Sequence, residues 1–383
     1  MKPFPTPDFT AVETPCYLCE EARLEANLRL LQRIEEESGA RILLALKGFA
    51  LWGTFPLVRR YLSGCAASGL HEARLGREEM GKEVHTYSPA FKESDLAQIA
   101  AISDHIVFNT PQQVRRFAAL ARAVNPAIEC SLRLNPEVSV APVDLYDPSA
   151  PGSRLGTTLA QFDPVIVDEL DGFHFHLLCE QDSYALETVL NPFLHKFGHY
   201  LPRLKSLNLG GGHHITREGY DVDHLIHLLR DLRQRYPQLT VYLEPGEAIG
   251  WQTGTLVATV LEIMHNGIDI AILDCSAEAH MPDTLAMPYR AEVRGAGKCG
   301  EKPYCYRLSG NTCLAGDVMG DYSFEQPLEV GDRIIFEDQI HYTMVKNSTF
   351  NGIKLPNLAL FRSRGEIQLL REFGYEEYRR RLS

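Results

Sequence analysis

Short apolar runs alternate with helix-like segments over residues 41–244, and this alternation limits the fold more than any other feature of the chain. The segments between the runs, such as PQQVRRFAALARAV and DVDHLIHLLRDLRQRY, repeat apolar residues every three or four positions, as amphipathic helices do. Strands that alternate with helices pair in parallel, and eight of them predict a closed (β/α)8 barrel of the TIM type. The eight runs are RILLAL, GCAAS, VHTYS, HIVFN, IECSLRLN, GFHFHL, KSLNL and TVYLE.

After about residue 251 the pattern changes to strand-like segments separated by turn residues, which predicts an antiparallel β domain. These segments are TGTLVATVLEIM, IDIAILD, YCYRLSG, LEVGDRIIFED and ALFRSRGEIQLL. The stretch TPCYLCE precedes the first helix-like segment, so we expect it to add a strand to this domain. The expected domains are therefore a barrel at 20–250 and a β domain formed by 1–19 plus 251–383.

The formal net charge of -12 argues against a nucleic-acid partner and is compatible with a cationic ligand. No apolar run is long enough to span a bilayer and no leader pattern is visible, so we expect a cytoplasmic protein without a membrane partner. In that compartment its nine cysteines are expected to be reduced. The pair Cys16 and Cys19 has no second pair to complete a zinc site, which favours a packing role.

Candidate active-site residues lie at the carboxyl ends of three of the expected barrel strands, where TIM barrels carry their active sites. Lys47 follows the first run, Gly210–Gly212 follow the seventh, and Glu244 ends the eighth. Glycines at that place let backbone N–H groups approach a phosphate, and a desolvated lysine can form a Schiff base. Together with a carboxylate for a pyridine nitrogen, these residues favour pyridoxal phosphate. Each also has a structural alternative: a surface lysine, a flexible linker and a capping carboxylate.

A metal-dependent hydrolase is the rival interpretation. His174 and His176 share one face of a strand, and with His213 and His214 they could ligate zinc. That reading leaves the three glycines unexplained, and we would expect such a histidine pair on the first strand, where Lys47 stands. One imidazole stacked on a cofactor ring fits the pattern better.

Six stretches together resemble the pyridoxal-phosphate decarboxylases of the alanine-racemase-like fold, a family that includes ornithine and diaminopimelate decarboxylases. The similarity runs nearly end to end and is greatest to the branch that acts on carboxynorspermidine and carboxyspermidine. It implies PLP-dependent release of CO2 to give norspermidine or spermidine, a step of polyamine biosynthesis. The stretches are LLALKGFA, GFHFHLLCE, LNLGGGHHIT, EPGEAIGWQTG, SGNTCLAGDVMGDY and HYTMVKNSTFNG.

The resemblance also implies roles for single residues. Lys47 would carry the cofactor, His176 would stack on its ring, and Glu244 would hold the pyridine nitrogen. Cys313 would come from the partner subunit of a two-fold homodimer and act near the reacting carbon. The implied cofactor-binding set is Lys47, Glu72, His176, Gly211, Gly212, Glu244, Gly246 and Tyr342.

Departures from the family pattern indicate the substrate. The wider group commonly has an arginine after E-P-G, where this chain has Glu247, and an acid after the cysteine, where it has Leu314. A glutamate repels a distal carboxylate and pairs with an ammonium group, so we expect a small cationic polyamine substrate. Asp283 and Asp317 are further candidate substrate-binding acids, although a turn aspartate explains Asp283 equally well. Cys179 replaces an expected hydroxyl, which puts one phosphate contact in doubt.

Three alternatives remain beside this expectation. The first is a decarboxylase of the diaminopimelate or ornithine type, and the second is a catalytically silent PLP-binding homologue that acts by dimerisation. The third, a racemase, conflicts with the E-P-G and GNTC segments. The two polyamine precursors differ by one methylene, which a pocket discriminates by only about 1–3 kcal/mol, so the preferred one stays open.

Overall fold

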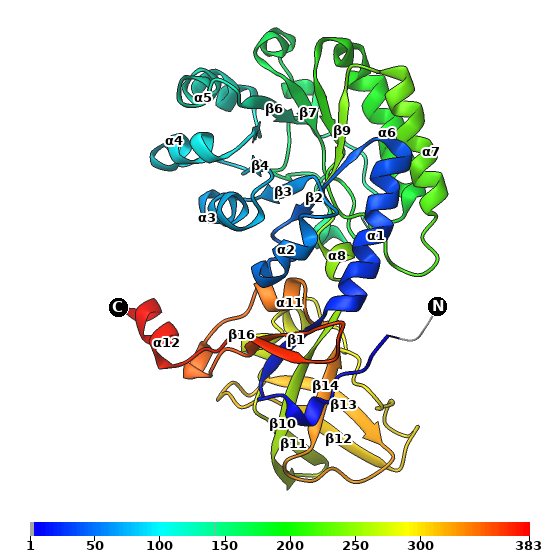
Figure 1. Ribbon diagram of the computed structural model, residues 1–383, viewed down its shortest axis with the longest axis vertical. Helices are drawn as coiled ribbons and strands as arrows, with labels where there is room; N and C mark the ends of the chain where they lie inside the picture. The colour runs from blue at the N-terminus through cyan, green and yellow to red at the C-terminus, as the bar shows by residue number, and fades with distance from the viewer. Residues whose placement is uncertain (1–3, 142) are drawn as a thin grey trace. The chain divides into compact units, whose positions relative to one another are not determined.

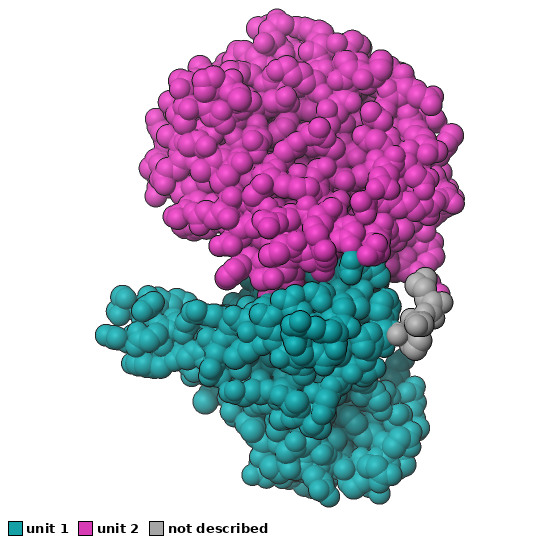
Figure 2. All heavy atoms as spheres, viewed as in Figure 1, with its two compact units in different colours: residues 1–26, 250–383 teal, residues 27–249 magenta. Residues whose placement is uncertain are grey.

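The computed structural model describes residues 4–141 and 143–383. The chain divides into two compact units, one formed by Met1–Ala26 with Gly250–Ser383 and the other by Asn27–Ile249 (Figure 2). Within the described residues, none of the helices combines the length and the apolar character that crossing a membrane requires.

The unit Asn27–Ile249 contains a closed barrel of parallel strands, in which the first strand pairs with the last. All eight apolar runs of the sequence form its strands, so the predicted barrel is confirmed. In chain order the strands are β2 (Arg41–Ala45), β3 (Gly64–Ala67), β4 (Glu83–Tyr87), β5 (His105–Phe108), β6 (Glu129–Arg133), β7 (Gly172–His174), β8 (Ser206–Asn208) and β9 (Thr240–Leu243).

Helices surround the barrel strands (Figure 1). Three long helices begin at capping residues, because the side chains of Thr110, Asp182 and Asp221 accept hydrogen bonds from backbone N–H groups of the first turn. In α5 the buried residues Val114, Phe117, Ala118 and Ala121 follow the helical repeat and face the strands. The helices are α1 (Glu21–Ser38), α2 (Phe55–Val58), α3 (Leu70–Leu75), α4 (Glu93–Ile102), α5 (Pro111–Val124), α6 (Ser183–Phe197), α7 (Val222–Arg235) and α8 (Glu247–Gly250).

The other unit is built on a sheet whose strand order is β13-β12-β11-β10-β1-β15-β16, with β14 paired to β10. The β domain and its N-terminal strand are confirmed, but the sheet is mixed: β1 is parallel to β15 and β11 is parallel to β12. The strand β13 was not predicted. The strands are β1 (Cys16–Glu20), β10 (Gly254–His265), β11 (Asp269–Leu273), β12 (Tyr304–Ser309), β13 (Val318–Phe324), β14 (Arg333–Glu337), β15 (Asn357–Phe361) and β16 (Ile367–Arg371).

Short helices lie between or after these strands, and the sheet carries a small apolar core. The helices are α9 (Ala277–His280), α10 (Asp283–Ala286), α11 (Tyr342–Val345) and α12 (Tyr375–Leu382). The core contains Val12, Cys16, Leu18, Val257, Ala359 and Phe361. Cys16 belongs to it and Cys19 is buried and unpaired, which fits the expected packing role. Cys299 and Cys305 form a disulfide, so the expectation that all cysteines are reduced is wrong for these two.

Candidate active site

Lys47 lies directly beyond β2, in a turn closed by hydrogen bonds from the backbone N–H groups of Gly48 and Phe49 to the carbonyl of Ala45. Its side chain keeps solvent contact. The surrounding protein atoms nevertheless lower the pKa of the Lys47 amine, and the positive charge of Arg133 lowers it further against the opposing effect of Glu244. An amine with a lowered pKa is the form of lysine that adds to carbonyl groups.

Glu244 follows β9, and its side chain is almost fully buried. Asn208 Nδ2 donates a hydrogen bond of 2.7 Å to Glu244 Oε1, and His174 Nε2 lies 3.4 Å from Oε2. Burial by itself raises the pKa of the carboxyl group, but the interactions with His174, followed by those with His85 and Asn208, outweigh it and hold the pKa at about 2. The carboxylate is therefore ionised at neutral pH.

His176 lies two residues beyond His174, which ends β7. Its Nδ1 accepts a hydrogen bond of 3.0 Å from the backbone N–H of Gly211, which fixes the orientation of the ring. Burial, followed by the charges of Lys47 and Arg133, lowers the pKa of His176 well below its usual value, so the imidazole is neutral. His174, His176, His213 and His214 do not form a metal-ligand group in the described part of the chain, which leaves the zinc interpretation without support.

Glycines allow the loops beyond β8 and β9 to pack against neighbouring backbone. Gly210 and Gly212 have φ angles of +72° and +83°, and a Cβ atom on Gly212 would overlap the carbonyl of Leu178. A Cβ atom on Gly48 would lie 2.9 Å from the Cα of Gly246, so the loop after Lys47 touches the E-P-G turn. Only glycine fits such close approaches, and the result is a closely packed run of backbone beside His176.

Arg133, at the end of β6, is a site residue that the sequence reasoning missed. It is buried, donates a hydrogen bond of 2.9 Å to the carbonyl of His176, and lies 4.7 Å from the ring centroid of Tyr87. It therefore holds the backbone that carries His176 and places a positive charge near Lys47. A single arginine inside an apolar strand carries no local pattern that distinguishes it from an arginine at the surface.

Glu247 is the first residue of α8 and is half-buried. Burial raises the pKa of the Cys179 thiol to about 11, and the charges of Glu180 and Glu247 contribute to this shift. The Glu247 carboxylate therefore lies near Cys179, in the same region of the barrel as Lys47. Glu72 lies in α3, accepts a hydrogen bond of 2.7 Å from the backbone of Ser68, and acts on the pKa of Lys47.

Cys313 belongs to the other unit and is exposed. Its backbone N–H donates a hydrogen bond of 2.7 Å to Asn351 Oδ1. The nearby Asp317 is buried, and its carboxylate accepts hydrogen bonds from the backbone of Ala277 and from the Thr312 hydroxyl, each of 2.6 Å. Asp317 thus holds the loop that carries Cys313.

Asp283 and Tyr342 also lie in this unit, on either side of Lys346. Lys346 Nζ donates a hydrogen bond of 2.6 Å to Asp283 Oδ1 and lies 5.3 Å from the ring centroid of Tyr342. The structure thus groups the predicted residues as Lys47, Glu72, His176, Gly211, Gly212, Glu244, Gly246 and Glu247 in the barrel unit and Asp283, Cys313, Asp317 and Tyr342 in the sheet unit.

Comparison with known proteins identifies the class. Residues 16–339 match the family described as pyridoxal-dependent decarboxylase, C-terminal sheet domain. The chain belongs to this family of pyridoxal-dependent decarboxylases.

Within the family, the chain is similar over its whole length to decarboxylases with carboxylated polyamine precursors in their names. It is 49% identical over 381 residues to the carboxynorspermidine/carboxyspermidine decarboxylase of Campylobacter jejuni subsp. jejuni serotype O:6, covering 97% of this chain and 98% of the relative. It is 47% identical to the carboxyaminopropylagmatine decarboxylase of Synechocystis sp., covering 98% and 97% of the two chains.

Solved structures of decarboxylases are also similar to this chain. The crystal structure of Campylobacter jejuni carboxynorspermidine decarboxylase complexed with norspermidine has a TM-score of 0.90 and 48% identity, covering 97% of this chain and 100% of that one. A diaminopimelate decarboxylase, with a TM-score of 0.80 and 17% identity, shares the fold.

Proposed function

We propose that this chain decarboxylates carboxynorspermidine or carboxyspermidine to norspermidine or spermidine with pyridoxal phosphate as its cofactor. The near full-length similarity to the Campylobacter enzyme supports the reaction, and the norspermidine in the related crystal structure supports the product class. The observation that carries the specificity is Glu247, a half-buried carboxylate beside Cys179 in the part of the barrel that holds Lys47. Such an acid pairs with an ammonium group of the substrate.

The residues of the barrel unit fit the cofactor. Lys47 offers an amine with a lowered pKa, and Glu244 offers an ionised carboxylate for a pyridinium nitrogen. The backbone at Gly211 and Gly212 would bind the phosphate, for which the Gly211 N–H would exchange its bond to His176 Nδ1. When bound, pyridoxal phosphate supplies an electron-accepting ring that stabilises the negative charge left on the substrate carbon. We propose that Glu72, His176, Gly246 and Tyr342 complete the set of residues that holds it.

We propose a task for each of the main residues of the site. Asn208 and His174 fix the Glu244 carboxylate, so its negative charge would be in place to hold a protonated pyridine nitrogen. Arg133 fixes the backbone of His176, whose neutral ring would pack against the cofactor. Lys47 would hold the cofactor through its amine, because the lowered pKa leaves that amine able to bond to a carbonyl carbon. Cys313 returns a proton to the reacting carbon, because a thiol can donate when it is placed within reach.

The three acids proposed for the substrate have different surroundings. Glu247 is our main candidate for an ammonium group. The Asp283 carboxylate is already paired with Lys346, so we propose that it binds substrate only by exchanging that partner. The Asp317 carboxylate is occupied by its own loop, and we propose that it serves the substrate indirectly by positioning Cys313. We further propose that the active form is a homodimer in which the partner's Cys313 completes each site.

Carboxyaminopropylagmatine is a second candidate substrate, supported by the name of a full-length relative. The Synechocystis relative is named for carboxyaminopropylagmatine, and it covers this chain as fully as the Campylobacter enzyme does. The same acid could therefore face a different cationic group. Incubation of the cofactor-loaded chain with each carboxylated amine, with the product identified by mass spectrometry, tests the proposal. Lys47→Ala should form no product, whereas product formation by that variant would contradict the assigned role of Lys47.

A further inference from the structure

A second group of ionisable side chains lies at the opposite ends of the barrel strands. Glu83 and His105 are the first residues of β4 and β5, and His85 is the third residue of β4. Lys47 and Glu244, by contrast, follow the last residues of β2 and β9. Because all of these strands are parallel, the second group lies at the amino ends of the strands, away from the cofactor residues.

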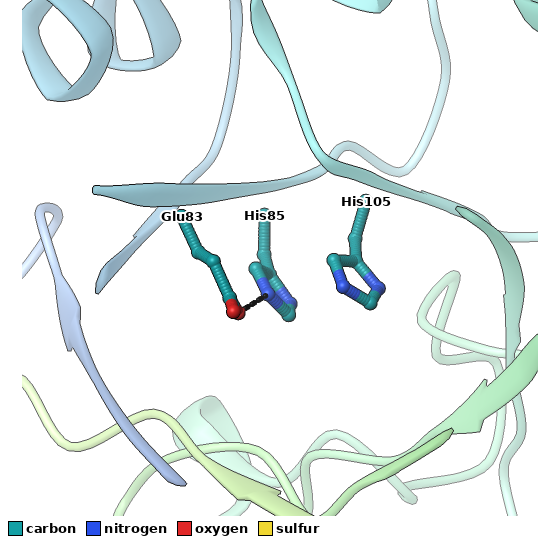
Figure 3. Close-up of side chains that lie close together, drawn as sticks. All are labelled: Glu83, His85 and His105. Atoms are coloured by element: carbon teal, nitrogen blue, oxygen red, sulfur yellow. Dashed lines mark hydrogen bonds and ion pairs between the residues drawn. The ribbon is translucent and has the colours of Figure 1, made fainter. Parts of the chain in front are cut away.

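The strand geometry brings the three side chains together. Residues two apart in a strand share a face, so Glu83 and His85 point the same way, and His85 pairs in register with His105 on the neighbouring strand. All three point into the space enclosed by the barrel (Figure 3). One ligand atom from each residue lies within 4.8 Å of the others. The two imidazole rings stack with their centroids 3.8 Å apart and their planes 17° apart, so one ring has to turn before both can direct a nitrogen at the same ion.

The chemical state of the group suits a cation. Burial, followed by the charge of His85, lowers the pKa of His105 to about 2, so this imidazole is neutral and its nitrogen lone pair is free to bind. Burial raises the pKa of Glu83, but the interactions with His85 and Arg41 outweigh it and keep the carboxyl group ionised. Two imidazoles and one carboxylate form a ligand set that zinc uses in proteins.

Neighbouring residues already orient these ligands. Glu129, the first residue of β6, places a carboxylate oxygen 3.5 Å from His105 Nδ1. A carboxylate behind a histidine fixes the orientation and protonated nitrogen of the ring, as it does around many metal ions. Tyr242 packs edge-on against both rings, with centroid distances of 4.6 Å to His85 and 5.5 Å to His105.

Two positive groups lie near the set, Arg41 and Lys205, and Arg41, which contacts it directly, leaves room for a cation. Arg41 binds Glu83 Oε1, whereas Oε2 of the same carboxylate lies 3.3 Å from His85 Nε2. A carboxylate has about four lone-pair positions, so one oxygen can keep the arginine while the other binds an ion. The Glu83 side chain is 28% exposed, which gives an ion a route from solvent.

We propose that Glu83, His85 and His105 form a binding site for a divalent transition-metal ion such as zinc, with three protein ligands and one water molecule. The ion would join β4 to β5 at the end of the barrel where residues serve stability, while decarboxylation takes place at the other end. Zinc should bind more tightly than manganese, in line with the general order of affinities for nitrogen and oxygen ligands.

Metal titration of the cofactor-loaded full chain, after treatment with a chelator, tests this proposal. Cobalt(II) should bind with one ion per chain and give the visible spectrum of a four-coordinate nitrogen and oxygen site, without absorption from a thiolate. Glu83→Gln and His105→Gln should each weaken zinc binding at least tenfold. His265→Gln is the matched control, because His265 also pairs with a carboxylate, Asp269, but lies at the surface, so it should leave the zinc affinity unchanged.

Glu129→Gln should weaken binding by about tenfold, as is typical for residues that support a ligand from behind. Zinc should raise the melting temperature of the wild type and not that of Glu83→Gln, since only a bound ion stabilises the folded state. X-ray absorption of the zinc-loaded wild type should count two imidazole ligands, and this measurement needs no variant to fold. The proposal would be overturned if cobalt(II) or zinc failed to bind with one ion per chain, or if the spectrum showed a thiolate ligand. It would also be overturned if X-ray absorption counted fewer than two imidazoles, or if folded Glu83→Gln and His105→Gln kept the wild-type zinc affinity.

Discussion

Asn208 at the end of β8 donates a hydrogen bond of 2.7 Å to the Glu244 carboxylate at the end of β9. Both side chains are buried, so this bond replaces water that the carboxylate would otherwise bind. The charge that we propose for the cofactor nitrogen is thus held by a residue of a neighbouring strand.

The first prediction concerns this bond. Asn208→Leu keeps the approximate volume and removes the donor, which leaves a buried charge short of a partner at a cost of about 1–3 kcal/mol. If that cost falls on the reacting complex, kcat/KM should decrease by about 5- to 150-fold, as steady-state kinetics would measure. Asn125→Leu is the control, because Asn125 donates to the backbone of Ala100 and Ser103 and should affect stability without changing kcat/KM. Equal kcat/KM for Asn208→Leu and the wild type would contradict the role of the bond.

The second prediction concerns the substrate. Glu247→Arg should bind cofactor with an unchanged visible spectrum but lower kcat/KM for carboxynorspermidine at least a hundredfold, because it replaces an attractive charge with a repulsive one. Glu218→Arg makes the same charge change at an exposed position and should behave as the wild type. Full activity of Glu247→Arg would remove the basis for its role in specificity.

The third prediction concerns the loop of Cys313. Asn351 has a φ angle of +56° and accepts a hydrogen bond from the Cys313 backbone. Asn351→Gly removes that bond but suits the left-handed backbone, so turnover should fall with little change in melting temperature. Asn351→Ala should lose turnover and also about 1–2 kcal/mol of stability, because alanine is strained in this conformation. Wild-type turnover in Asn351→Gly would show that the bond does not position Cys313.

The fourth prediction concerns pH. Burial lowers the pKa values of His213 and His280 to about 4, from 6.5 in the unfolded chain. Between these values the unfolded state binds more protons than the folded state, so stability is full above pH 6.5 and falls as the pH drops to 4. Each histidine contributes a slope of about 1.4 kcal/mol per pH unit inside that window. Urea unfolding at pH 7.5 and at pH 5 measures how much the free energy of unfolding decreases between them. This decrease should be smaller for His280→Gln than for the wild type, whereas an equal decrease would argue against the contribution of His280.

The barrel could be predicted because each strand is a short apolar run with a helical repeat on both sides. The sheet unit was harder, since its pairings join distant parts of the chain. The parallel pairing of β1 with β15 has no local signal, and β13 contains Gly320 and Asp321, which strand patterns disfavour.

The site was predictable where residues follow strands and unpredictable where they lie within them. Lys47, His176 and Glu244 follow strand ends, which is where a TIM barrel directs attention. Asn208 and Arg133 are the last residues of their strands, embedded in apolar runs, and only the folded structure shows what they bind. Glu83 and His85 did have a signal, since residues two positions apart in a strand share one face.

Release of CO2 by the cofactor-loaded chain tests the central claim most directly. Carboxynorspermidine, carboxyspermidine, carboxyaminopropylagmatine, diaminopimelate and ornithine would be compared at equal concentrations. The account predicts rapid release from carboxynorspermidine or carboxyspermidine, little from diaminopimelate and ornithine, and none from any substrate with Lys47→Ala. If CO2 came mainly from carboxyaminopropylagmatine, this compound would be the substrate in place of the two proposed. If it came mainly from diaminopimelate or ornithine, the role assigned to Glu247 would be contradicted. No release from any of the five would contradict the account itself and favour a catalytically silent homologue.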